Sequence, residues 1–171
     1  WIEDGALTFP VSEITISLDF DALMQSIDLV GNDRDRKVLR VLSAAGDKAF
    51  SSGADITDLP ELWRAIPTVG FKTMKPVIAA TSGWCVGGAI VMVMMCDMLV
   101  SSDSTTFYYP EAKIALTGGM IAALPSRIPH KIAMELIMLC RVIEAERAVN
   151  VGLANEVVET GKALETAIAW G

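Results

Sequence analysis

An apolar run that contains two adjacent glycines constrains this chain more than any other feature. From Gly83 to Asp97 the sequence reads GWCVGGAIVMVMMCD, with no charged residue before Asp97. About 20 apolar residues are needed to cross a bilayer, so this run is too short to span one. We therefore expect residues 84–96 to form a helix that protein covers on every face.

The patterns around this run predict an α/β domain. Short runs of aliphatic residues or strict alternation indicate strands, whereas apolar residues three or four positions apart indicate helices. Strands are expected at residues 13–19, 37–43, 76–81 and 98–101, and further helices at residues 20–29 and 132–139. Strands that alternate with helices are typical of a mainly parallel sheet with helices packed on it.

Length and composition limit the number of domains. The chain has 171 residues, of which 52% are hydrophobic and 20% are charged. This content is enough for a compact core, but the chain is too short for two full domains. We expect a single domain over residues 1–171.

Charge and cysteine content argue against several classes of partner. With 14 basic and 21 acidic residues the net charge is −7, and the densest basic group, residues 34–40, is interleaved with aspartates. This is not the basic patch of a nucleic-acid-binding protein. Cys85, Cys96 and Cys140 are odd in number and have no CxxC spacing, so neither a disulfide framework nor a zinc site is expected. The sequence predicts no metal and a reducing, cytoplasmic setting.

The two glycines, Gly87 and Gly88, follow a predicted strand at the point where a helix is expected to begin. The first N–H groups of a helix have no partner within it, and glycine lets another group approach them closely. Spacing alone leaves two interpretations open, because the pair also suits close packing of the helix against its neighbours. The second interpretation is a binding site for an anion or an oxyanion.

A second motif, AFSSGADI at residues 49–56, follows the strand expected at residues 37–43. Here the chain resembles the crotonase family, also called the enoyl-CoA hydratase/isomerase family. The resemblance covers most of the sequence, in the family's order, through DKAFSSGADI, KPVIAATSGWCVGG, MMCDMLVSSDSTTFYYPEAKIAL and AMELIMLCRVIEAERAVNVGLANEVV. It implies a crotonase-like α/β fold, with layers of parallel sheet flanked by helices in repeated ββα units.

The resemblance implies acyl-CoA chemistry in which the thioester carbonyl becomes an enolate. Two backbone N–H groups hold the enolate charge in this family, and by position they belong to Ala54 and Gly88. Coenzyme A is part of the substrate, so no separate cofactor is expected. Many relatives have a lysine where Thr57 stands, which argues against a specific phosphate contact there. The residues expected to contact substrate are Ser52, Ala54, Asp55, Ile56, Gly87, Gly88 and Tyr109.

Proton transfer needs a further group. Family hydratases use two carboxylates, and Glu111 in YYPEAK matches the second, whereas Val91 stands at the position of the first. Adding water asks for one group to activate the water and one to handle the α-proton, but a single base can move a double bond. We therefore expect isomerisation ahead of hydration, with Glu111 as the base. Its aromatic neighbours Tyr108 and Tyr109 would raise its pKa by burying it, or would line the acyl pocket.

Other functions stay open at this point. A hydratase, lyase or decarboxylase would take its second group from another segment, and a non-catalytic acyl-CoA-binding or assembly subunit would need none. The resemblance implies an acyl-CoA thioester as ligand, no nucleic acid or membrane partner, and a homo-oligomer that is a trimer or a dimer of trimers. Relatives continue with C-terminal helices, which we expect to be missing from these 171 residues.

Overall fold

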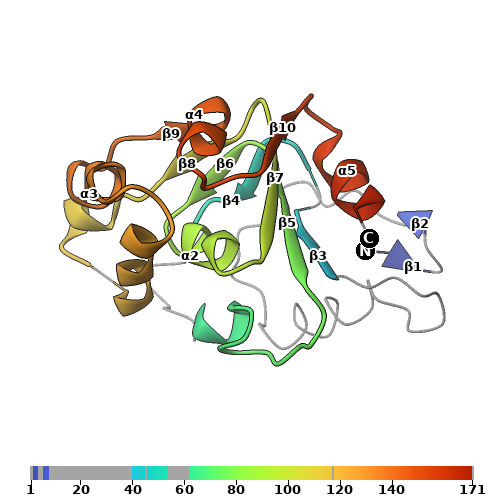
Figure 1. Ribbon diagram of the computed structural model, residues 1–171, viewed down its shortest axis with the longest axis horizontal. Coiled ribbons are helices and arrows are strands. Elements are labelled where there is room, and N and C mark those ends of the chain that lie inside the picture. Colours follow the sequence, from blue (N-terminus) through green and yellow to red (C-terminus); the bar gives the residue numbers. More distant parts are fainter. Residues whose placement is uncertain are drawn as a thin grey trace.

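The protein forms two four-stranded sheets with helices packed around them (Figure 1). The structure is a computed structural model that describes residues 2–3, 6–7, 40–44, 46–53, 62–116 and 118–170. The strands are β1 (Ile2–Glu3), β2 (Ala6–Leu7), β3 (Arg40–Ser43), β4 (Ala49–Ser51), β5 (Val77–Thr81), β6 (Trp84–Val86), β7 (Met98–Ser102), β8 (Thr106–Tyr108), β9 (Ile143–Glu144) and β10 (Glu156–Val158). The helices are α2 (Gly88–Met94), α3 (His130–Leu139), α4 (Ala145–Asn150) and α5 (Ala163–Ala169), with 3₁₀-helices η1 (Leu62–Ala65), η2 (Glu111–Ile114) and η3 (Gly119–Ser126).

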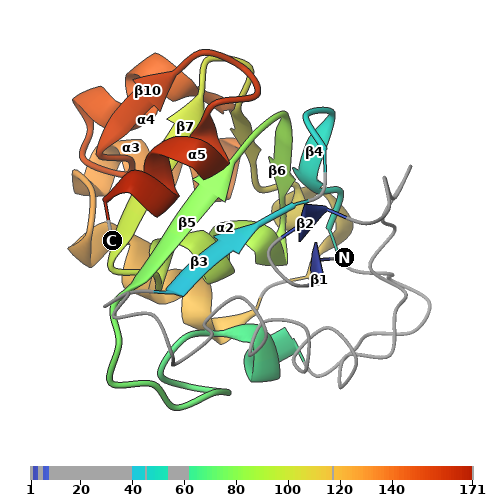
Figure 2. The same cartoon turned by 90° about the vertical axis from the view of Figure 1, so that its right-hand side faces the viewer.

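The first sheet has the strand order β10-β7-β5-β3, and all its neighbours are parallel. Successive side chains of a strand point to opposite faces of the sheet. Each face of this sheet therefore packs against a different helix. Val77 and Ala79 of β5 join the main core, which includes α2. Ile78 and Ala80 join a second core formed with α5, which lies across the sheet in Figure 2.

The second sheet has the order β4-β6-β8-β9, with β4, β6 and β8 mutually parallel and β9 antiparallel to β8. The prediction that residues 84–96 form one helix is wrong for its first three residues, which form β6. This strand is paired on both sides, and Trp84 is exposed while Cys85 is buried. A short apolar run does not reveal by periodicity whether it is strand or helix, and here pairing with β4 and β8 decides.

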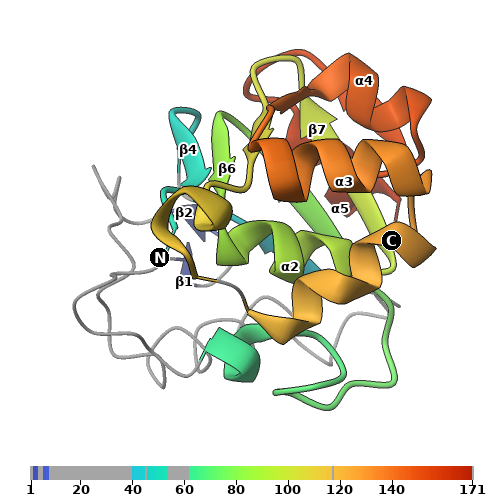
Figure 3. The ribbon, with the colours of Figure 1, turned by 90° about the vertical axis from the view of Figure 1, so that its left-hand side faces the viewer.

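Residues 88–94 confirm the predicted buried helix, whereas Gly87, Met95 and Cys96 lie outside it. In α2 every residue after Gly88 is buried. The turn that follows α2 is held at both ends. At its start, Arg127 donates from Nε to the carbonyl of Met94 over 2.7 Å. At its end, Oδ2 of Asp97 accepts the N–H of Val77 over 2.8 Å. Figure 3 shows η3 beside α2, and α3 in turn packs against η3. Across the described residues, none of the helices has the length and apolar character required for a bilayer crossing.

Several other predicted elements are confirmed. Strands β5 and β7 match the runs at 76–81 and 98–101, and α3 includes residues 132–139. Strand β3 covers residues 40–43 of the predicted strand at 37–43. The strand at 13–19 and the helix at 20–29 lie outside the described residues.

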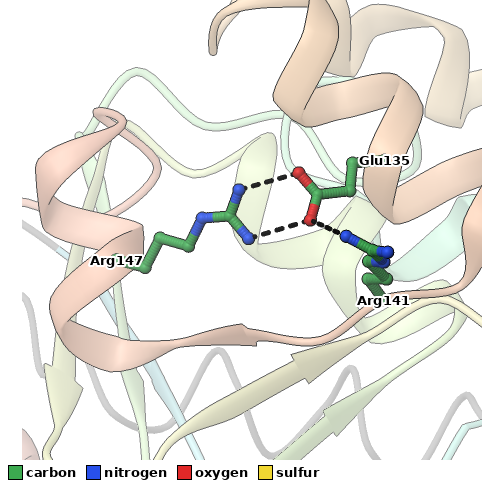
Figure 4. Close-up of polar contacts among 3 residues, drawn as sticks. All are labelled: Glu135, Arg141 and Arg147. Carbon is green, nitrogen blue, oxygen red and sulfur yellow. Dashed lines mark hydrogen bonds and ion pairs between the residues drawn. The ribbon is translucent and has the colours of Figure 1, made fainter.

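An ion-pair cluster joins α3 to α4 (Figure 4). Arg147 donates from both terminal nitrogens to the carboxylate of Glu135, over 3.1 and 2.8 Å. Arg141 adds a longer contact of 3.5 Å to the same carboxylate. The hydrogen bond from Arg147 is the main cause that lowers the pKa of Glu135. This bidentate geometry links α4 to α3.

Candidate active site

Three neighbouring parallel strands bring some of the predicted site residues together. Strands β4, β6 and β8 are paired so that Ser51 lies opposite Cys85, and Val86 lies opposite Tyr108. Because parallel strands end at the same edge of a sheet, the segments that follow them meet there. Those segments carry Ser52 and Gly53, then Gly87 and Gly88, then Glu111.

Gly87 occupies a position that only glycine fits. Its backbone has φ 61° and ψ −124°, a region that side-chain-bearing residues avoid. A Cβ at this residue would lie 2.7 Å from Oε1 of Glu111, which is closer than atoms pack. Its N–H donates to the carbonyl of Tyr108 over 2.9 Å. The backbone conformation therefore requires glycine here, and the Glu111 carboxylate fills the space beside it, which the sequence did not reveal.

Gly88 is the first residue of α2, and its N–H finds no acceptor among the described residues. The next turn is closed by the N–H of Ile90, which donates to the carbonyl of Gly87 over 3.0 Å. Within the described part of the chain the amide of Gly88 is therefore open to a ligand, as an oxyanion donor must be.

The segment after β4 begins beside the glycine pair. A Cβ on Gly53 would lie 3.7 Å from both the carbonyl oxygen and Cγ1 of Val86, the residue that precedes Gly87. The N–H of Gly53 donates to the hydroxyl of Ser51 over 3.2 Å, and Ser52 is exposed. Ala54, Asp55 and Ile56 lie outside the described residues. The second oxyanion donor and the contacts of Asp55 and Ile56 with substrate stay predictions.

Glu111 begins η2 directly after Pro110 and is half-buried. Its Oε2 atom is shielded from solvent and has no hydrogen-bond partner among the described residues. Burial raises the pKa of Glu111, and a hydrogen bond from its own backbone opposes this in part. A carboxyl group with a raised pKa beside an available amide is suited to general acid–base work.

Tyr109, the remaining predicted site residue among those described, lies deeper, as does Val91 at the position of the missing acid. Val91 is 6% exposed and Tyr109 is 2% exposed, and both belong to the main core. The site of the first family carboxylate is thus an apolar position inside the helix packing. Tyr109 sits where a packing side chain sits, and its contact with substrate stays a prediction.

Sequence reasoning missed one pair beside the site. Lys113 donates from Nζ to the hydroxyl of Tyr108 over 2.9 Å, and its ammonium lies 5.3 Å from the centroid of that ring. The rings of Trp84 and Tyr108 also pack in a T-shaped arrangement, with their centroids 6.2 Å apart. Nothing in the spacing of a lysine five residues after a tyrosine indicates this contact, because it depends on the fold of η2.

Most of the chain is similar to known proteins. The family model described as enoyl-CoA hydratase/isomerase matches residues 20–171. A short-chain-enoyl-CoA hydratase of Clostridium acetobutylicum is 32% identical over 166 residues, which cover 88% of this chain and 64% of that protein. A carnitinyl-CoA dehydratase of Citrobacter koseri is 30% identical over 92% of this chain and 68% of that protein.

Solved structures of enoyl-CoA hydratases are also similar to this chain. A crystal structure of an enoyl-CoA hydratase from Mycobacterium marinum superposes with a TM-score of 0.71 at 33% identity, over 88% of this chain and 61% of that one. The chain spans about three fifths of the length of the first relatives it matches, from 55% to 64%. These neighbours share the crotonase fold, with parallel sheet and flanking helices. On this match over most of its residues, the chain belongs to the enoyl-CoA hydratase/isomerase family.

Proposed function

We propose that this chain forms the catalytic core of an enzyme that adds water reversibly to a 2-enoyl-CoA thioester. The observation that carries the proposal is the position of the Glu111 carboxylate, which fills the space beside Gly87 and so lies next to the available amide of Gly88. The relatives are named hydratases and dehydratases, which favours hydration over the isomerisation that the sequence alone suggested.

One carboxylate can serve both steps of this reaction. As water attacks C3 of the enoyl group, Glu111 accepts a proton from it, and the electrons of the double bond move to the thioester oxygen. The amide of Gly88 donates to that oxygen. A donor of this kind lowers the barrier by about 3 kcal/mol. Protonated Glu111 then returns its proton to C2, which restores the thioester carbonyl and the carboxylate. Water is consumed, and no other reactant is needed.

A raised pKa suits this double role. A carboxylate must be basic enough to take a proton from water in the transition state, and its acid form must give the proton back at once. Burial of Glu111 raises its pKa, which makes the carboxylate a stronger base while its acid form can still return the proton.

Isomerisation of a 3-enoyl-CoA is the second candidate, and Val91 favours it. This residue places a buried apolar side chain where family hydratases have an acid. Moving the double bond requires Glu111 to remove a proton from C2 and return it to C4, with the same oxyanion holding the charge. No water enters the product.

Both candidates can be tested together on the full-length protein in water enriched in ¹⁸O. Loss of the absorbance of a 2-enoyl-CoA with ¹⁸O in the product shows hydration, and turnover of a 3-enoyl-CoA without ¹⁸O shows isomerisation. The variant Glu111→Gln should lower kcat by about 10²- to 10⁴-fold, the usual contribution of an acid–base group. Glu144→Gln, an exposed carboxylate of the same sheet, is the matched control and should keep the wild-type rate.

Two results would overturn the proposal. Full activity of Glu111→Gln would remove the assigned acid–base group. Calorimetric binding of CoA esters by a protein that turns over neither a 2-enoyl-CoA nor a 3-enoyl-CoA would instead indicate a non-catalytic acyl-CoA-binding subunit.

A further inference from the structure

We propose that Lys113 is a positioning residue for Glu111, and that it acts by fastening the η2 turn to strand β8 through the hydroxyl of Tyr108. The inference rests on the proposed role of Glu111. It adds a residue to that site, which neither the sequence motifs nor the relatives' names identify.

The turn that carries Glu111 has little packing of its own. No residue of η2 is buried, and residues 112–116 are all exposed. Its hydrogen bonds are mostly internal: the N–H of Lys113 donates to the carbonyl of Pro110 over 2.9 Å, and that of Leu116 donates to the carbonyl of Glu111 over 3.0 Å. These bonds shape the turn, but they do not attach it to the sheet.

Beyond the buried Tyr109, which joins β8 to the turn, the side chain of Lys113 links η2 to the sheet. Its Nζ donates to the Tyr108 hydroxyl over 2.9 Å, and the ammonium also faces the ring. Tyr108 is itself fixed, because β8 pairs with β6 and the edge of Trp84 packs against the ring. Helix α3 also packs against η2. The hydrogen bond to Tyr108 is the main cause that raises the pKa of Lys113, and Cys140, which follows α3, contributes less. A lysine on an exposed turn thereby gains a fixed partner.

The same tyrosine also holds the other half of the site. Its carbonyl accepts the N–H of Gly87 over 2.9 Å, and Gly87 is the residue whose α-carbon faces Oε1 of Glu111. Tyr108 therefore holds both parts of the site. Its side chain holds the turn that carries Glu111, through Lys113, and its backbone carbonyl holds the glycine pair. A shift of η2 away from Tyr108 would carry Glu111 away from the amide of Gly88.

Lys113 acts on the place of Glu111 rather than on its charge. The causes that shift the pKa of Glu111 are burial and its own backbone, with no contribution from the Lys113 ammonium. If the turn moves outward when the tether is cut, the carboxyl group becomes hydrated and its pKa falls toward the ordinary range. This gives a signature that a general loss of stability does not share.

The experiment compares Lys113→Met, Tyr108→Phe, the double variant and Lys113→Arg in the full-length protein. Lys113→Met should lower kcat about tenfold with little change in KM, since a displacement near 1 Å can cost about a hundredfold. The acid limb of its pH–rate profile should move to lower pH. Lys113→Arg, which keeps a donor, should recover most of the rate. The double variant should be no worse than either single one, because both cut the same link. Lys131→Met, an exposed lysine on α3, is the control.

The inference on Lys113 would be overturned if Lys113→Met kept the wild-type kcat and an unshifted acid limb of the pH–rate profile. In that case a loss of activity in Glu111→Gln would still support the proposed function. Losses that add up in the double variant would also contradict a shared link. If the wild-type protein turns over no enoyl-CoA, ¹³C NMR titration of the Glu111 carboxyl, assigned with Glu111→Gln, still decides the question. The tether then predicts a lower Glu111 pKa in Lys113→Met than in wild type, and equal values refute it.

Discussion

Replacing Gly87 by alanine tests the geometry of the site most directly. The new Cβ would lie 2.7 Å from Oε1 of Glu111, whereas ordinary contacts begin at 3.4 Å, so the carboxylate must retreat by about 0.7 Å, the difference of the two. The backbone at φ 61° and ψ −124° adds strain of about 1–3 kcal/mol for a residue with a side chain. The variant should therefore be less stable by that amount.

The same displacement sets the expected loss of rate. A misplacement of about 1 Å can cost about a hundredfold in rate, so Gly87→Ala should lower kcat between about tenfold and a hundredfold. The assay is kcat on the preferred enoyl-CoA, together with urea unfolding to confirm that the variant is folded under assay conditions.

Gly152→Ala separates the two effects. Gly152 also has a positive φ, of 79°, but no described atom lies within 4 Å of the Cβ position. This variant should lose about 1 kcal/mol of stability from the left-handed backbone and keep the wild-type kcat. A folded Gly87→Ala protein with the wild-type rate, or an equal loss of rate in Gly152→Ala, would refute the steric argument.

Two further predictions concern pH. Because burial raises the pKa of Glu111 and the base form starts the reaction, kcat/KM of the wild type should fall with decreasing pH at a midpoint above the ordinary carboxyl range; a midpoint at or below that range would contradict this. The hydrogen bond from Arg147 is the main cause that lowers the pKa of Glu135 in the folded protein. Its contribution to folding stability is therefore complete above the ordinary carboxyl pKa and is lost as pH falls through the lowered pKa of the folded state. Arg147→Met removes this contribution. Urea unfolding should show a clear loss at pH 7 and little at about pH 3, with a smaller loss for Arg141→Met, whose contact is longer; equal losses at both pH values would count against the pair.

Much of the fold could be predicted because its signals are local. The aliphatic runs of β5 and β7 and the helical spacing of α3 are visible in the sequence, and they follow from burial on both faces of a sheet or on one face of a helix. Strand β6 could not be predicted in the same way. Its three residues are a strand because β4 and β8 lie on either side, and pairing with distant segments leaves no period in so short a run.

The candidate site divides along the same line. The sequence alone determined the chemical groups: a glycine pair after a strand, one carboxylate in a proline-containing loop, and valine in place of a second acid. Only the tertiary structure decided that Glu111 fills the space beside Gly87, and that Lys113 reaches Tyr108. The physical reason is that residue identity and local spacing limit which groups a chain carries. Which of them meet depends on strand register and on turns, and these are fixed by contacts between segments far apart in the chain.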